Sequence, residues 1–176
     1  VRGGRIGAQR GHVVAGRRAA RGGGFFTGMD TAHCPTDAVK HRTSAEDQEF
    51  RRAFEACETT PDEFDHAAHV RLAYIYLCEH PVDVATERMK KALLAYLAHL
   101  GVGAAKYHET ITRAWIMAVR HFMAESASCA SAYAFIKANP RLLDSKIMLT
   151  HYSAEVLFSP RARQGFVEPD IQPIPG

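Results

Sequence analysis

Two histidines, His66 and His69, stand three residues apart in the stretch FDHAAHVRLAYIYL, residues 64–77. In an α-helix this spacing leaves the two side chains about 60° apart around the axis, so both imidazoles point to the same side. Val70, Ala73 and Leu77 continue that side, which indicates that it faces the interior. Two imidazoles on one inward face are a recurrent way of binding a transition metal.

A second stretch, KYHETITRAW at residues 106–115, places His108 beside Glu109 at the head of another apolar pattern. His108 begins a face that Thr112 and Trp115 continue, so we expect its imidazole to point inward as well. In a helical bundle the two stretches can be neighbours. Three imidazoles and a carboxylate would then converge on one centre.

From these residues we predict a mononuclear divalent-metal enzyme that acts on a small molecule by hydrolysis, transfer or oxidation. His66, His69 and His108 would hold the metal and leave one position open for water or substrate. Glu109 or Asp65 would serve as a fourth ligand or as the general base. The metal would be Zn²⁺, Fe²⁺, Mn²⁺ or Ni²⁺, because imidazoles and carboxylates suit all four.

Two other interpretations of the histidines stay open. A metal-free His/Asp/Tyr network would line a pocket for an organic ligand or a partner's segment, with hydroxyls from Tyr74, Tyr76 and Tyr107. Alternatively, the histidines are structural residues of the core.

In the metal-binding interpretation Asp65, four residues before His69, would accept the ring N–H that does not coordinate. The sequence carries none of the usual motifs of metalloproteases, nucleotide-binding loops or serine nucleophiles.

The elements that must position these residues are all helical in pattern, and no stretch shows sustained alternation of apolar and polar residues. The run from Ser44 to Asp47 resembles a capping box, and Thr60-Pro61 resembles a helix start. We predict an all-α antiparallel bundle of four main helices, at about 45–58, 60–79, 83–100 and 106–125. Two or three short C-terminal helices should follow, at about 131–138, 140–150 and 153–158.

The first 43 residues differ from the rest in composition, and we predict a disordered Arg/Gly-rich arm at 1–43 and one helical domain at 44–176. Residues 1–28 contain six arginines and no acid, so removing this +6 from the formal net charge of +3 leaves −3 for the remainder. A mildly acidic body argues against a nucleic-acid groove within it. Three interpretations of the arm are open: a basic segment that binds nucleic acid or anionic lipid, a transit-like peptide, or sequence upstream of a true start at Met29. The composition favours the third.

The remaining composition is that of an ordinary cytoplasmic protein. The four cysteines form no CxxC pair, which argues against a disulfide framework or a thiolate zinc site. No apolar run reaches the length of about 18 residues that a membrane-spanning helix needs, and no secretory h-region is present. We therefore expect a small-molecule partner and no membrane; the oligomeric state is not predicted.

Four motifs, FDHAAHVRLAYIYL, KYHETITRAW, NPRLLDSKIMLTHYS and LFSPRARQGFVEPDIQPIP, resemble those of an uncharacterised bacterial family of small all-helical proteins. The resemblance covers about residues 50–175 and implies the helical fold without implying a reaction. A looser analogy joins the chain to the DinB-like helical-bundle enzymes, which hold a divalent metal with three histidines. This sequence lacks the HxxxH spacing typical of that group.

Overall fold

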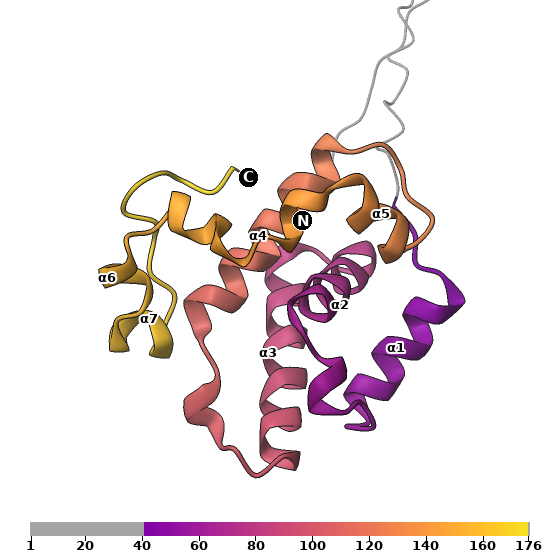
Figure 1. The fold of residues 1–176 in the computed structure, drawn as a ribbon, viewed down its shortest axis with the longest axis horizontal. Coiled ribbons are helices and arrows are strands. Elements are labelled where there is room, and N and C mark those ends of the chain that lie inside the picture. Colours follow the sequence, from indigo (N-terminus) through magenta and orange to yellow (C-terminus); the bar gives the residue numbers. More distant parts are fainter. Residues whose placement is uncertain (1–40, 176) are drawn as a thin grey trace, which may run out of the picture. The chain divides into compact units, whose positions relative to one another are not determined.

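The computed structural model describes residues 41–175, and within that range the chain is all-α, without a strand (Figure 1). The predicted fold class is therefore confirmed. The predicted start at Met29 and residues 1–40 of the predicted arm lie outside the described residues. No helix within residues 41–175 is both long and apolar enough to cross a membrane.

Helix α1 (Ala45–Glu55) begins at the predicted capping box. The Ser44 hydroxyl accepts a hydrogen bond from the Asp47 backbone N–H at 3.2 Å, and the Asp47 carboxylate accepts one from the Ser44 N–H at 3.0 Å. Asp47 is 1 % exposed and also accepts from the backbone N–H of Ala132 and from Arg71, at 2.8 and 2.9 Å. The fully paired carboxylate joins three helices, because Arg71 belongs to α2 (His66–Glu79) and Ala132 to α5 (Ala132–Ala138).

Helix α2 (His66–Glu79) begins later than the sequence suggests. The Thr60-Pro61 start opens only a short 3-10 turn, η1 (Pro61–Glu63), after which the backbone leaves helical geometry. Asp65 then caps α2, and its carboxylate accepts a hydrogen bond from the Ala68 N–H at 2.9 Å. His66 is therefore the first residue of the α-helix rather than a residue in its second turn.

The start of helix α4 (Glu109–Glu125) is also displaced. The sequence pattern predicts a helix from Lys106, but Ala104–Lys106 form a separate 3-10 turn, η2, and Tyr107 is extended. His108 is consequently the N-cap of α4, with non-helical backbone angles. This shift of three residues determines where the His108 side chain points.

Helix α2 lies at the centre of the helical body and contacts α1, α3 (Val82–His99), α4 and α5 (Ala132–Ala138). Its residues from Leu72 to Leu77 are all buried, as expected for a helix that is apolar around its whole circumference. Figure 1 views α2 nearly end-on while α3 runs across the view. The predicted antiparallel arrangement of four helices is not confirmed.

The segments after α5 are shorter than predicted. They comprise two 3-10 segments, η3 (Pro140–Leu143) and η4 (Ser145–Thr150), and two short helices, α6 (Ala154–Leu157) and α7 (Pro160–Gln164). The tail then packs on α4, where the Thr110 hydroxyl accepts a hydrogen bond from the Val167 N–H at 3.0 Å and donates one to the Gly165 carbonyl at 2.9 Å. Ile174 is buried at 6 % exposure, so the tail is part of the packed body.

His41, which the sequence assigns to the arm, is packed into the body. It is 6 % exposed, and its Nε2 donates to the Met123 carbonyl at 2.9 Å. Its ring meets those of Tyr74 and Phe135 edge-on, with ring centres 5.6 Å apart in both cases. The segment ahead of α1 is anchored here by contacts that are distant in sequence and leave no local pattern.

Candidate functional site

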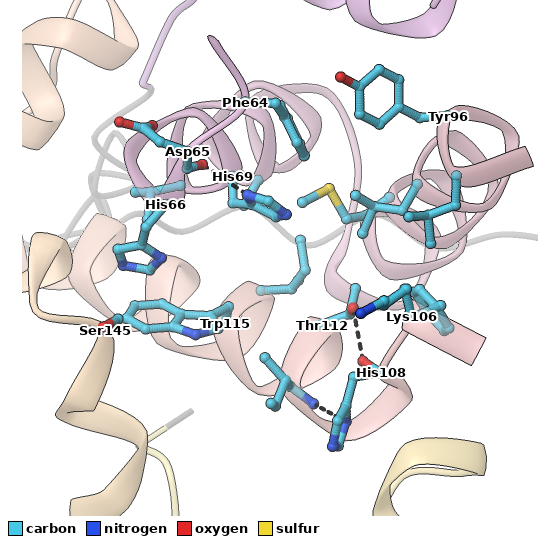
Figure 2. A pocket seen from close by; sticks show the side chains of 18 of the residues that line it. Phe64, Asp65, His66, His69, Tyr96, Lys106, His108, Thr112, Trp115 and Ser145 are labelled. Carbon is cyan, nitrogen blue, oxygen red and sulfur yellow. Dashed lines mark hydrogen bonds between the residues drawn. The ribbon is translucent and has the colours of Figure 1, made fainter. Parts of the chain in front are cut away.

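A cavity of about 630 Å³ opens between α2, α3 and α4 and contains most of the residues predicted to do chemistry (Figure 2). Four of the five predicted site residues line it, namely Asp65, His66, His69 and His108. Most of the wall is apolar, with a smaller number of polar and charged groups. The apolar wall residues include Val70, Ala73, Met89, Leu93, Leu97, Ile111, Trp115 and Ile116.

His66 connects the C-terminal segments to α2 through a hydrogen bond. Its Nε2 donates a hydrogen bond to the Leu142 carbonyl of η3 at 2.9 Å. Its ring also stands edge-on against Trp115, with 4.5 Å between ring centres. Because a carbonyl can only accept, the Nε2 of His66 carries the proton and is committed to this bond.

His69 presents an unpaired nitrogen to the cavity. Its Nδ1 donates to the backbone carbonyl of Asp65 at 2.8 Å, and its ring packs on Phe64 with 4.1 Å between centres. This bond fixes the proton on Nδ1 and leaves Nε2 as an acceptor, which has no hydrogen-bond partner among residues 41–175. Figure 2 shows the ring projecting toward the middle of the cavity.

Burial keeps the His69 imidazole neutral. Removal from water is the main reason that the pKa of His69 is lowered, and the charge of a protonated His66 acts in the same direction. The hydrogen bond to the Asp65 backbone opposes this shift without reversing it. At neutral pH the cavity therefore contains an oriented lone pair on Nε2.

His108 has a different role from the predicted one. As the N-cap of α4, it accepts a hydrogen bond at Nδ1 from the Ile111 backbone N–H at 3.3 Å. Figure 2 shows its ring turned away from His69 and Trp115. Its Nε2 is buried and makes no hydrogen bond to the described part of the chain. Burial lowers the pKa of His108, and the positive charge of Arg163 lowers it further, whereas the Leu157 backbone acts in the opposite direction.

The predicted metal site is therefore wrong. Within residues 41–175 no group of three or more His, Cys, Asp or Glu side chains is placed to hold a metal ion. His66 is bonded to Leu142, and His108 turns back over its own helix because it is the cap rather than an interior residue. The three imidazoles consequently do not converge, and the metal-enzyme hypothesis is set aside.

The two predicted carboxylates are also engaged in structural contacts. The Asp65 carboxylate caps α2, and it is the Asp65 backbone carbonyl, not the carboxylate, that orients His69. Glu109 does not line the cavity and pairs with Lys90 of α3, with 2.8 Å between Oε2 and Nζ. A general-base role for either residue stays an untested prediction.

Two cations that the sequence interpretation overlooked also line the cavity, Lys106 and Arg163. Lys106 comes from η2, and Figure 2 shows its side chain directed into the cavity. Arg163 comes from α7, and its Nη1 donates to the Ala105 carbonyl at 3.3 Å. Lys106 stands next to the predicted site in sequence and was available to that interpretation, whereas Arg163 is more than 50 residues away and had no such signal.

Tyr107 also lines the cavity, but its hydroxyl group is enclosed. Tyr107 is 9 % exposed, and its hydroxyl oxygen is buried without a hydrogen-bond partner in the described residues. Burial raises the pKa of Tyr107, so the phenol is neutral. A buried hydroxyl without a partner is uncommon in folded proteins, and this oxygen is enclosed in the wall rather than open to the cavity.

Comparison with protein-family models, curated proteins and solved structures finds no match to this chain. The resemblance to a bacterial family of small helical proteins therefore stays a prediction.

Proposed function

We propose that this chain is a metal-free ligand-binding module that holds a small, largely apolar organic molecule in the cavity between α2, α3 and α4. The observation that carries the proposal is the His69 imidazole, which is oriented by the Asp65 carbonyl and directs an unpaired Nε2 into the cavity. This function is the metal-free alternative that the sequence left open.

The size and lining of the cavity support this proposal. Binding sites for small organic molecules are concave, enclose about 300–1,000 Å³ and combine apolar walls with a few placed polar groups. The cavity of about 630 Å³ falls within that range, and its walls are built from three packed helices. The site is thus preformed and requires no rearrangement of the main helices.

His69 determines which polar group the ligand must have. An acceptor that is partly removed from water and left unpaired costs free energy, and a ligand N–H or O–H group would relieve this cost. The lowered pKa of His69 keeps Nε2 an acceptor at neutral pH. We therefore expect the ligand to place a donor group against Nε2.

The test uses phenylnaphthylamine, a neutral apolar probe with one N–H donor. Trp115 is the single tryptophan of the chain and lines the cavity, so quenching of its fluorescence reports binding there. We expect saturable binding to the parent and about a tenfold weaker affinity in His69→Leu, because one hydrogen bond is lost.

A matched pair at Thr112 checks that the probe occupies the cavity. Thr112 is a half-buried wall residue whose hydroxyl donates to the His108 carbonyl at 2.9 Å. Thr112→Phe should fill the cavity and abolish binding, whereas Thr112→Val removes only the hydroxyl and should bind like the parent. The proposal fails if the parent shows no saturable binding, or if His69→Leu or Thr112→Phe binds as tightly as the parent.

A further inference from the structure

Resting on the proposed function, we infer that the ligand is an organic acid whose anionic group is held by Lys106, with Arg163 beside it. The apolar part of the acid would lie along the helical walls and a donor group would meet His69. Some charges near the cavity are already neutralised within the protein, and those that are not can bind an anion.

Lys106 is the cation of the cavity that has no partner. No carboxylate or carbonyl in residues 41–175 pairs with its ammonium group, although the side chain lines the cavity. Neighbouring cations are neutralised in contrast, because Lys90 pairs with Glu109 at 2.8 Å and Arg113 pairs with Asp83 at 3.2 Å. The charge of Lys106 is therefore available to a ligand.

Arg163 adds a second positive charge that is held in place. Its Nη1 donates to the carbonyls of Ala105 and Tyr107, at 3.3 and 3.5 Å, on either side of Lys106 in the chain. These bonds hold α7 against the turn that carries Lys106. A carbonyl does not neutralise a guanidinium, so the positive charge remains.

Among the described residues that line the cavity one is acidic, and it lies away from Lys106. Asp65 is the acidic residue of the lining, and its carboxylate is engaged with the Ala68 N–H as the cap of α2. Figure 2 places Asp65 and Lys106 on opposite sides of the view. The Lys106 side of the cavity is thus electropositive and adjoins an apolar interior, which is the arrangement that an amphipathic acid requires.

The test compares two probes that differ by one anionic sulfonate group, phenylnaphthylamine and anilinonaphthalene sulfonate. A charge pair near the protein surface favours the sulfonate by about fivefold or more at low salt. We expect the parent to show this preference and Lys106→Gln to show a smaller one, since only the charge of Arg163 then remains. Lys106→Arg should restore the preference, because the charge is kept.

Lys90→Gln is the matched control, since it removes the same charge from a lysine that is paired outside the cavity lining. It should keep the preference for the sulfonate. The inference is overturned if the parent binds both probes equally, or if Lys106→Gln retains the full preference of the parent. These results would leave the proposed function standing, whereas failure of the neutral probe to bind the parent would overturn the proposed function itself.

Discussion

The first turns of α2 and α4 contain the same two kinds of residue in opposite order. At α2 the acid Asp65 precedes His66, and at α4 His108 precedes the acid Glu109. The first residue of each pair becomes the N-cap, so a carboxylate caps α2 and an imidazole caps α4. The caps are otherwise alike, since each accepts a hydrogen bond from the backbone N–H three residues ahead.

This difference in order decides which histidines remain available. The carboxylate cap of α2 leaves both His66 and His69 free to bond elsewhere, and His69 retains an open nitrogen in the cavity. The imidazole cap of α4 uses Nδ1 and buries Nε2 without a partner. A histidine at a helix start is therefore informative about function only when the capping residue is known.

The largest expected effect separates the two histidines of α2. His66→Leu should lower the free energy of unfolding by about 2 kcal/mol, because it leaves the Leu142 carbonyl without its donor. His69→Leu should cost less than half as much, since the Asp65 carbonyl that loses the Nδ1 donor still accepts from the backbone N–H of residue 69 at 3.1 Å. Urea denaturation measures both values. Equal losses in the two variants would contradict the assignment of His66 to the fold and His69 to the ligand.

The next effect is a pH dependence shared by the two helix starts. The pKa values of His69 and His108 are both lowered, so below about pH 6.5 the unfolded chain takes up protons that the folded chain does not. Stability should therefore fall as the pH is lowered from about 6.5 toward the lowered pKa values of the two groups.

Urea denaturation at about pH 8 and about pH 5.5 checks this dependence in the parent, His69→Gln and His108→Asn. Each substitution should reduce the difference between the two pH values. The prediction is wrong for any substituted histidine whose variant keeps the full loss of the parent.

The smallest effect compares the caps themselves. Asp65→Ala should cost about 1 kcal/mol, because Ala cannot accept from the Ala68 N–H, and Asp65→Asn should cost only a few tenths. His108→Asn should stay within about 0.5 kcal/mol of the parent, since Asn is a preferred cap and removes the unpaired Nε2. Thermal denaturation gives both comparisons. A loss above about 1 kcal/mol in His108→Asn would mean that the imidazole makes a structural bond, for which the Leu157 backbone is the nearest candidate.

Features set by residues close in sequence were predictable, whereas features set by contacts between distant residues were not. The capping box at Ser44 and the shared face of His66 and His69 are local features, set by spacings of three residues, and both were predictable. The start of α4 was not predictable in this way. Ala104–Lys106 favour helix by propensity, but the chain is extended at Tyr107, whose carbonyl accepts from Arg163 of α7.

The binding partners of the histidines show the same limit. The Leu142 carbonyl, which accepts the hydrogen bond from His66 Nε2, is 76 residues away in sequence. No spacing pattern in the sequence indicates such a contact. The prediction brought the correct two stretches to one cavity and then assumed that all three rings face it. Placing the rings requires knowledge of the caps and of the C-terminal segments.

The hydrogen bonds from Arg163 to the Ala105 and Tyr107 carbonyls affect how the chain folds during its synthesis. Synthesis proceeds from the N-terminus, so α2, α3 and α4 leave the ribosome before α7 does. The apolar walls thus exist for a short time without the residue that holds the turn of Lys106 in place. A nascent chain that stops before α7 would expose this unfinished cavity, which makes an arrested product a target for chaperones and proteases.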